Sequence, residues 1–301
     1  MHDIIIIGGG PAGLTAAVYA LRAGKTALVI EKNSFGGQIA FSPKVENIPG
    51  MLQISGAAFA DQLAEQTMSL GADVELENVV SAERNGDTFL VHTEEGSTFE
   101  GRALIIAVGV RHRMLGLEGE DKLIGSGLSF CAVCDGAFYT GQDVAMIGGG
   151  NSALQEALLL SDVCRKVTIV QNLPFLTGEK TLSDALAQKD NVEILLSTVV
   201  TAYETEGGAL TGLRLRGEDG SEQRIAVSGA FLAVGLEPKN EAFAHLAQTD
   251  AQGYFASAEN CLTATPGVFV AGDCRAKGIR QVVTAAADGA VAAMAACRWL
   301  D

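Results

Sequence analysis

The hydrophobic positions near the start of the chain follow the order strand, turn, helix, strand. Residues 3–32 contain an apolar run (IIII), a glycine-rich turn (GGGPAG), a helical stretch (LTAAVYALRAG), a second apolar run (TALVI) and then an acid. Short apolar runs bounded by turn residues are typical of buried strands. A strand that leads through a glycine turn into a helix and a second strand predicts a βαβ unit of the dinucleotide-binding type.

The same order of elements returns in residues 143–171, which read DVAMI, GGGNSA, LQEALLLSDVCRK and VTIVQ. Gln171 lies 23 residues after Gly148, and Glu31 lies 23 residues after Gly8. Because both the motif and its spacing are repeated, we expect two dinucleotide folds in one chain.

Short alternating strands with turns follow each βαβ unit, in residues 88–106 and 209–227. This alternation predicts small antiparallel meanders. The segments IIAVGV at 105–110 and FLAVGLEP at 231–238 end the two halves, and we expect them to be matching late strands.

The tail of the chain carries one more short apolar strand, in the segment TPGVFVAGD at 265–273. The simplest topology returns this tail to the first domain and leaves the second domain inserted between roughly Arg113 and Asn240. The sequence therefore predicts an α/β fold with two Rossmann-like dinucleotide-binding domains, the second inserted into the first, each with a small antiparallel β meander.

Length and charge narrow the class of protein. The 301 residues suit two domains, since single cores stop growing near about 250 residues. A net charge of −15 disfavours binding to nucleic acid or to an anionic membrane surface. The apolar stretch from Val282 to Cys297 is interrupted by Asp288 and Gly289, so it is too short for a membrane span. With no signal-peptide pattern at the start, we expect a cytoplasmic protein.

The first glycine turn matches the pattern GxGxxG with Gly8, Gly10 and Gly13. These glycines permit a tight turn, close approach of a pyrophosphate to the backbone, and packing of the helix on the strand. Glu31 stands where an acid accepts hydrogen bonds from an adenosine ribose. The alternative is a glycine-rich turn without a ligand, with Glu31 a solvated acid at a strand end.

The second turn repeats the pattern with alanine as its last small residue. The position after the second strand, where this kind of unit selects its nucleotide, is unusual. Gln171 is neither an acid for a ribose diol nor an arginine for a 2′-phosphate. Binding of a nicotinamide nucleotide is one interpretation, and an inherited fold with a weakened or empty site is the other. The candidate contacts are Gly148, Gly150, Asn151, Ser152, Ala153 and Gln171.

Two of the six cysteines, Cys131 and Cys134, stand two residues apart in SFCAVCDGAF. This spacing allows a reversible disulfide, and the adjacent Asp135 can donate or accept a proton. A zinc site is an alternative, although zinc needs about four ligands and no second CxxC or suitably spaced pair of histidines exists. An inert pair is another. The remaining cysteines are expected to be small apolar residues: Cys164, Cys261, Cys274 and Cys297.

Taken in order, the segments GGGPAG, GGQ, ENIPG, AVG, CAVCDG, GGGNSA, AVG, AGD and RQVVTAAADGAVAA resemble the low-molecular-weight thioredoxin reductases over nearly the whole chain. The resemblance implies that residues 1–113 with 243–301 bind FAD, that residues 114–242 form a nucleotide-binding domain carrying CxxC, and that the protein is a homodimer. The FAD contacts it implies are Gly8, Gly10, Pro11, Ala12, Gly13, Glu31, Gln38, Asn47, Gly272, Asp273, Arg280, Gln281 and Val282.

The chain departs from this family after the second nucleotide strand. NADPH-using members carry HRRxxxR there, whereas this chain has Gln171, Asn172, Leu173 and then Thr177. The cationic side chains for a 2′-phosphate are missing, which puts NADPH in doubt and leaves NADH as a candidate. Some relatives that lack this motif take electrons from ferredoxin, so ferredoxin is a third candidate donor.

The resemblance also implies a mechanism. Reduced FAD passes electrons to the Cys131–Cys134 disulfide, and the dithiol reduces thioredoxin or a similar small protein disulfide. Cys134 is then the cysteine on the flavin side, and Cys131 attacks the partner's disulfide. Asp135 donates or accepts the proton during the exchange. Two alternatives remain at this point: an FAD-binding redox sensor without turnover, and a reductase of another disulfide substrate.

Overall fold

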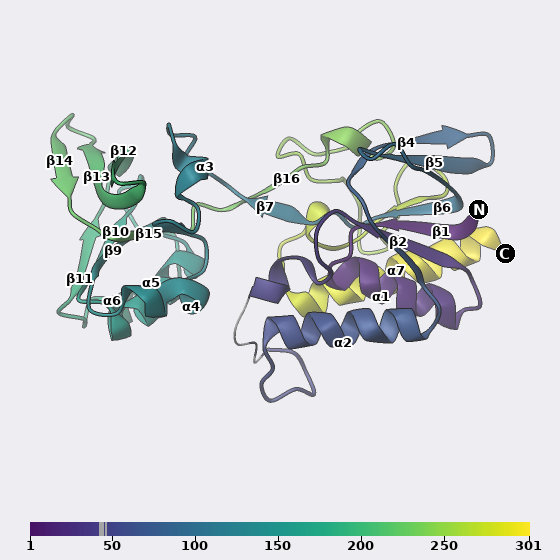
Figure 1. The fold of residues 1–301 in the computed structure, drawn as a ribbon, viewed down its shortest axis with the longest axis horizontal. Helices are drawn as coiled ribbons and strands as arrows, with labels where there is room; N and C mark the ends of the chain where they lie inside the picture. The colour runs from purple at the N-terminus through teal and green to yellow at the C-terminus, as the bar shows by residue number, and fades with distance from the viewer. Residues whose placement is uncertain (42–44, 46) are drawn as a thin grey trace. The chain divides into compact units, whose positions relative to one another are not determined.

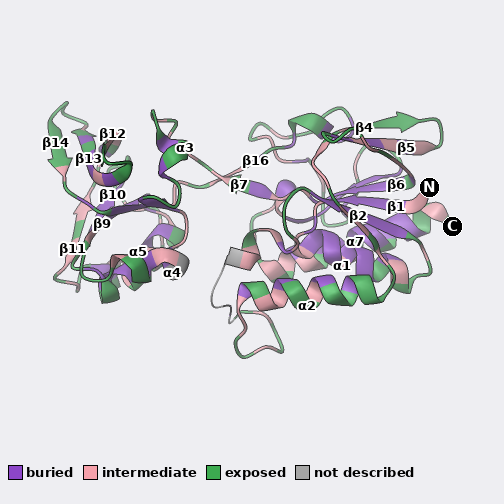
Figure 2. Cartoon of the chain, viewed as in Figure 1, coloured by how far each residue is buried: buried purple, intermediate pink, exposed green. Residues whose placement is uncertain are grey.

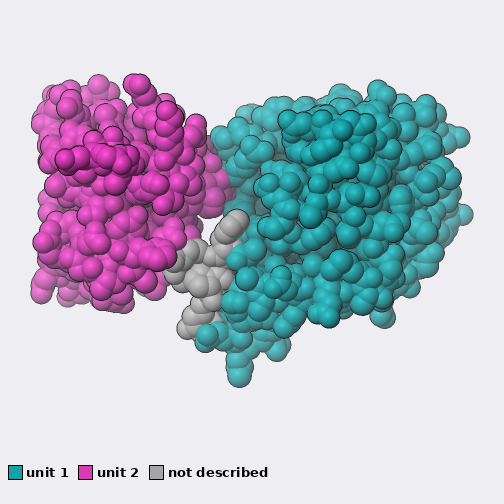
Figure 3. Space-filling view, in the orientation of Figure 1, with its two compact units in different colours: residues 1–111, 237–301 teal, residues 112–236 magenta. Residues whose placement is uncertain are grey.

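The computed structural model describes residues 1–41, 45 and 47–301, without the side chains of Phe41, Val133 and Cys134. The chain forms two compact units, residues 1–111 with 237–301 and residues 112–236 (Figure 3). It passes from one unit to the other through β7 (Val110–His112) and β16 (Leu236–Pro238), which form a two-stranded sheet.

These boundaries lie a few residues before those expected from the sequence, 113/114 and 242/243. The later boundary differs more because the short helix η3 (Glu241–Phe243) already packs in unit 1, with Phe243 buried in its core.

Unit 1 is built on one sheet with the strand order β3-β2-β1-β6-β5-β4, and β17 pairs with β6 (Figure 1). β1, β2, β3, β6 and β17 run parallel, whereas β4, β5 and β6 form an antiparallel meander, as the alternating pattern predicted. Its strands are β1 (His2–Ile7), β2 (Ala27–Glu31), β3 (Asp73–Leu76), β4 (Val79–Asn85), β5 (Thr88–Thr93), β6 (Thr98–Ile106) and β17 (Val268–Val270). Its helices are α1 (Pro11–Arg22), η1 (Gly37–Phe41), α2 (Gly56–Ser69), η3, η4 (Gly272–Cys274) and α7 (Val282–Leu300).

The central strand β1 is buried on both faces, which explains its unbroken apolar run. Ile4 and Ile6 belong to the core that contains α1 and α7. Ile5 and Ile7 belong to the opposite core, together with Phe255 from the segment after η3. In Figure 2 the strands in the middle of unit 1 are coloured purple, as buried residues. The sheet therefore has the two covered faces that a doubly wound fold requires.

Unit 2 repeats the plan with a parallel sheet of order β11-β10-β9-β15-β8. Val144 and Met146 of β9 pack toward α5, and Ala145 and Ile147 pack toward the antiparallel sheet β12-β13-β14. Its strands are β8 (Leu128–Ser129), β9 (Asp143–Ile147), β10 (Lys166–Val170), β11 (Val192–Leu195), β12 (Thr198–Glu206), β13 (Ala209–Gly217), β14 (Glu222–Ile225) and β15 (Gly229–Leu232). Its helices are α3 (Glu120–Leu123), α4 (Ala132–Asp135), η2 (Gly136–Tyr139), α5 (Asn151–Val163) and α6 (Lys180–Leu186).

Each AVG segment proves to be the junction of two strands and not one continuous strand. In unit 1 the chain leaves β6 after Ile106 and enters β7 at Val110, with Gly109 at φ +67° between them. In unit 2 the corresponding glycine is Gly235, at φ +105°. A backbone in this region favours glycine, so the motif marks a turn that redirects the chain into the crossing strand.

Helices α1 and α7 pack against each other in unit 1. A Cβ on Gly289 would lie 2.1 Å from the carbonyl oxygen of Ala12, so only glycine allows the two backbones to approach this closely. Within the described residues, no helix combines the length and apolar character needed to cross a membrane.

Replacing Gly289 with alanine is therefore expected to destabilise the protein by about 1–3 kcal/mol, because the added methyl group forces the helices apart. Gly278→Ala is the matched control, since a Cβ at that position meets nothing within 4 Å. Urea unfolding of both variants measures the effect. Equal unfolding midpoints would contradict the packing role of Gly289.

Candidate active site

The glycine turn of unit 1 is held by two close backbone approaches. Gly8 has φ +110°, and a Cβ on it would lie 2.3 Å from the carbonyl oxygen of Ala107. A Cβ on Gly13 would lie 1.8 Å from the oxygen of Gly8. A Cβ on Gly10, in contrast, would meet only the oxygen of Gly36, at 4.0 Å. The first and third glycines thus serve packing, and Gly10 leaves open space at the start of α1, where a pyrophosphate fits.

Glu31, the last residue of β2, is fixed beside this turn. Its carboxylate accepts hydrogen bonds from the backbone N–H of Gly9 at 2.7 Å and of Asn33 at 3.1 Å. Gln38, in η1, donates its side-chain amide to the oxygen of Val110 at 2.7 Å. Glu31 and Gln38 are therefore both held by hydrogen bonds near the glycine turn, at the carboxyl end of the sheet.

The Gly-Asp segment after β17 reaches the same region. Gly272 lies so close to α1 that a Cβ on it would be 2.8 Å from the Cβ of Ala12. The next residue, Asp273, has a buried Oδ1 atom with no hydrogen-bond partner in the protein, and burial raises the pKa of this carboxyl group. A buried acceptor without a partner points to a missing donor, and a hydroxyl group of a bound cofactor fits that position.

The residues at the start of α7 bring together four further predicted contacts. Asn47 donates its side-chain amide to the Oε1 atom of Gln281 at 3.0 Å, and Gln281 caps α7, which begins at Val282. The guanidinium group of Arg280 lies 4.0 Å from the ring centre of Tyr254. Its Nε atom donates a hydrogen bond to the backbone carbonyl oxygen of Asp273. Segments that are distant in the sequence are thereby brought together.

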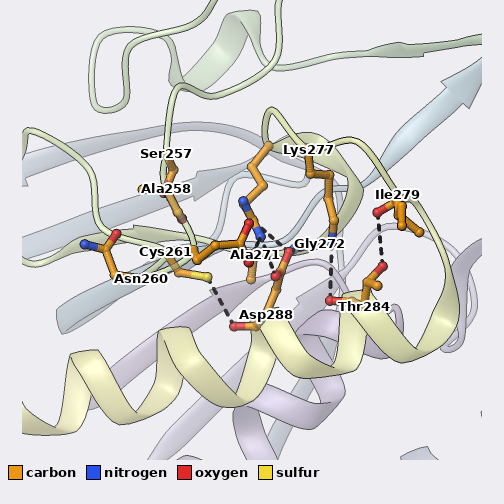
Figure 4. Close-up of polar contacts among 12 residues, drawn as sticks. Ser257, Ala258, Asn260, Cys261, Ala271, Gly272, Lys277, Ile279, Thr284 and Asp288 are labelled. Carbon is orange, nitrogen blue, oxygen red and sulfur yellow. Dashed lines mark hydrogen bonds and ion pairs between the residues drawn. The ribbon is translucent and has the colours of Figure 1, made fainter.

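A buried ionic cluster of Arg275, Lys277 and Asp288 contacts the Gly-Asp segment (Figure 4). The carboxylate of Asp288, on α7, accepts the backbone N–H of Gly272 at 3.0 Å, two bonds from Arg275 at 2.8 and 2.7 Å, and one from the Nζ of Lys277 at 2.8 Å. The side chains of Arg275, Lys277 and Asp288 are only 2%, 6% and 7% exposed. Burial acts to raise the pKa of Asp288, but the bonds from the two cations outweigh it and the pKa is lowered.

This cluster was missed in the sequence, where Asp288 was interpreted only as an interruption of an apolar stretch. The available signal was an acid on the buried side of an otherwise apolar helix, which requires a buried partner.

The glycine turn of unit 2 keeps the same frame. Gly148 has φ +128°, and a Cβ on it would lie 2.3 Å from the oxygen of Ala233, as in unit 1. Gln171, 5% exposed, packs directly on Gly149 and donates its amide to the oxygen of Phe175 at 3.3 Å. Gln171 therefore occupies the place that Glu31 takes in unit 1. Its side-chain NH₂ group, however, donates to the loop that follows β10.

The loop after β10 is fastened to the turn and carries an acid. Thr177 and Gly178 donate their backbone N–H groups to the oxygen of Gly149 at 2.8 and 2.9 Å. Asn151 accepts the N–H of Glu179 at 2.7 Å and donates to its carboxylate at 3.2 Å. A negative charge therefore lies at the first turn of α5, beside the exposed Ser152 and the buried Ala153.

The predicted redox motif lies in unit 2, where α4 packs against α5. Cys131 directly precedes α4 and is disulfide-bonded. Its N–H donates to the Oγ of Ser129 at 3.0 Å, and its oxygen accepts the N–H of Asp135 at 3.1 Å. The side chain of Cys134 lies outside the described residues. The other four cysteines are free and buried, as expected for small apolar residues: Cys164, Cys261, Cys274 and Cys297.

Comparisons with known proteins identify the family of this chain. Residues 2–289 match the family model described as pyridine nucleotide-disulphide oxidoreductase. The chain is 39% identical to the thioredoxin reductase of Listeria monocytogenes, over 100% of this chain and 94% of that protein. It superposes on the thioredoxin reductase of Lactococcus lactis with a TM-score of 0.90 and 34% identity, covering 100% and 99% of the two chains. The T. acidophilum thioredoxin reductase gives 0.86 and 31%, covering 99% and 98%.

The chain therefore belongs to the pyridine nucleotide-disulphide oxidoreductase family. Within that family it is a flavoprotein disulfide reductase of the thioredoxin reductase type.

Removing the carboxylate of the buried cluster, as in Asp288→Ala, is expected to cost about 3–5 kcal/mol of unfolding free energy, because Arg275 and Lys277 are left buried without their partner. The matched control is Glu259→Ala. Glu259 also faces Arg275, at 3.5 Å, but its side chain is 93% exposed, so its loss should cost at most about 1 kcal/mol. Chemical unfolding of the two variants separates these values, and similar losses would contradict the role given to Asp288.

Proposed function

We propose that this protein uses FAD held by unit 1 to reduce a disulfide formed by Cys131 and Cys134, and that the dithiol then reduces thioredoxin or a similar small protein disulfide. The observation that carries the proposal is the disulfide bond of Cys131 at the start of α4, within a family whose members are disulfide oxidoreductases. The thioredoxin reductase names of the relatives support thioredoxin as the partner.

The residues we assign to FAD fit a dinucleotide. Gly10 leaves room beside the start of α1, and the unpartnered Oδ1 of Asp273 can accept a hydrogen bond from the cofactor. When bound, FAD supplies the electron pair that reduces the disulfide. The full set of proposed contacts is Gly8, Gly10, Pro11, Ala12, Gly13, Glu31, Gln38, Asn47, Gly272, Asp273, Arg280, Gln281 and Val282.

The two cysteines have different roles in the proposed cycle. The thiolate of Cys131 attacks one sulfur of the partner's disulfide and forms a mixed disulfide, while the partner's other sulfur leaves as a thiolate and takes a proton. Cys134 then attacks the sulfur of Cys131, which re-forms the internal disulfide and releases the partner as a dithiol. Asp135, adjacent to Cys134, donates and accepts the proton in these steps.

We further propose that the protein works as a homodimer in the cytoplasm. The four free, buried thiols suit a reducing compartment, where structural disulfides are rare.

The assignment of roles predicts an asymmetry between two variants. Cys134→Ser should accumulate a mixed disulfide with thioredoxin, because Cys131 still attacks but no second thiol releases the partner. Cys131→Ser should not, and the double variant is the control. Non-reducing electrophoresis with mass spectrometry measures the adduct. A trap formed equally by both single variants would refute the order of attack, and full reductase activity in both would refute the site.

The alternative of a flavin-binding redox sensor makes a different prediction in solution. A sensor binds FAD but does not reduce thioredoxin repeatedly. Steady-state turnover of thioredoxin by the holoprotein, with a chemical or enzymatic electron source, distinguishes the two functions.

The electron donor is proposed from the charge around the second glycine turn. Gln171, Asn172, Leu173 and Thr177 supply no cation for a 2′-phosphate, and Glu179 adds a negative charge beside Asn151. A phosphate with nearly two negative charges needs charge-assisted bonds, which neutral amides do not replace. Lys166 and Lys180, the nearest cations in the sequence on either side of this segment, are paired with Glu193 at 2.7 Å and with Asp184 at 2.8 Å. These observations favour NADH over NADPH if the turn binds a nicotinamide nucleotide.

Anaerobic reduction of the flavin is expected to proceed at least as efficiently with NADH as with NADPH. Reduced ferredoxin tested in parallel becomes the favoured donor if neither nucleotide works. Arginine at positions 172 and 173 should raise kcat/KM for NADPH and leave the value for NADH unchanged. A kcat/KM for NADPH well above that for NADH in the natural protein would contradict this assignment.

A further inference from the structure

One acid in unit 2 has no role in the proposed cycle, although it touches the redox motif. Glu156 lies on α5, and its Oε2 atom accepts the backbone N–H of Ala132 at 3.1 Å. Ala132 is the first residue of α4 and directly follows Cys131. One peptide unit therefore separates the carboxyl group of Glu156 from the disulfide-bonded cysteine.

The surroundings of Glu156 offer no compensating charge. In the part of the chain that the structure describes, no cation forms an ion pair with it. The lysines and arginines nearby in the sequence are paired with other acids. Two titratable groups on the packed elements α4 and η2 are Asp135 and Tyr139, and neither is a cation. The charged groups on α6, β9, β10 and the far end of α5 are Lys180, Asp184, Asp143, Lys166 and Asp162.

Burial of this carboxyl group changes its acidity. Removal from water raises the pKa of Glu156 to about 7, while the bond from Ala132 opposes the shift only in part. The group therefore exchanges its proton close to neutral pH, the range in which a cysteine thiolate is formed and used.

The two groups must influence each other, because both become negative in the same small region. A carboxylate near Cys131 raises the free energy of a thiolate there, whereas the protonated acid does not. The oxidised disulfide carries no charge, so the effect arises only after reduction. The coupling is reciprocal: a thiolate at Cys131 favours the protonated form of Glu156.

We propose that Glu156 is a positioning residue that holds the CxxC turn through the Ala132 amide and takes up a proton when the cysteine pair is reduced. This inference rests on the proposed function. When two electrons reduce the disulfide, the S–S bond breaks, one sulfur takes a proton from Asp135 or water, and the other remains a thiolate. Glu156 binds a proton from solvent at this stage. It releases that proton when the thiolate attacks the partner and its negative charge leaves on the partner's sulfur.

Alkylation of the reduced holoprotein by iodoacetamide tests this coupling without any turnover. Burial raises the pKa of Cys164 and Cys261 to about 11, that of Cys274 to about 12, and also that of Cys297. These four thiols therefore react slowly, and the fast phase reports the CxxC pair. Rates are measured from about pH 5.5 to pH 9 for the natural protein, Glu156→Gln and Asp162→Asn. Glutamine can still accept the Ala132 N–H, so it imitates the protonated acid.

The expected signature is a pH-dependent difference between the first two proteins. Below about pH 6 they react at the same rate, because Glu156 is protonated. Between about pH 7 and pH 8 Glu156→Gln reacts about fivefold faster, because no carboxylate opposes the thiolate. Asp162→Asn removes an exposed acid from the same helix, where it pairs with Lys189, and should follow the natural protein throughout.

A second measurement checks the titration itself. The folded protein keeps a proton at Glu156 that the unfolded chain has lost above about pH 4.5, so the natural protein loses stability relative to Glu156→Gln as pH rises from about 4.5 to about 7. Parallel stability curves for the two proteins over this range would overturn the inference.

Identical alkylation profiles for the natural protein and Glu156→Gln would also overturn the proposed coupling. Glu156→Ala separates structure from charge, because it removes the hydrogen bond as well: a purely structural role would alter this variant alone. If reduction releases no fast-reacting thiols at all, the proposed disulfide function fails instead, so the two failures are distinguishable.

Discussion

The close approach of a glycine turn to the carbonyl oxygen that follows a neighbouring strand is the constraint on which both halves of the molecule depend. Gly8 faces Ala107 and Gly148 faces Ala233, each at a distance that leaves no room for a side chain. This contact fixes where the helix begins relative to the strand ends and therefore where a dinucleotide can lie. The facing oxygens belong to the AVG segments, so the turn, the strand end and the crossing strand are specified together.

Much of this arrangement follows from local sequence. Two unbroken apolar runs, each ending in GxGxx(G/A), predicted both βαβ units, and the alternating segments predicted both meanders. These features depend on periodicity and on glycine geometry, which short stretches of sequence record directly. The AVG segments were interpreted as single strands because their apolar character hid a turn that only the positive φ of Gly109 and Gly235 reveals.

Long-range pairing was harder to predict. Asp288 was recognised as polar, but its partners Arg275 and Lys277 are set by the packing of η4 on α7, which no local pattern specifies. Glu156 was not singled out for the same reason, since its contact with Ala132 joins residues on two separate helices. The hydrogen bond of the Gln171 side-chain amide likewise depends on a loop residue, since its acceptor is the backbone carbonyl of Phe175. Buried polar groups thus carry the information that hydrophobic patterning leaves out.

The paired crossing strands β7 and β16 bear on how such a protein can change during evolution. Both ends of unit 2 leave through neighbouring strands, so the whole unit joins unit 1 as an excursion from one place. Replacement of the inserted unit, or mutations accumulating within it, leave the seven-stranded sheet of unit 1 uninterrupted. Mutations can in this way accumulate in the inserted unit while the glycine turn and the core of unit 1 are inherited unchanged.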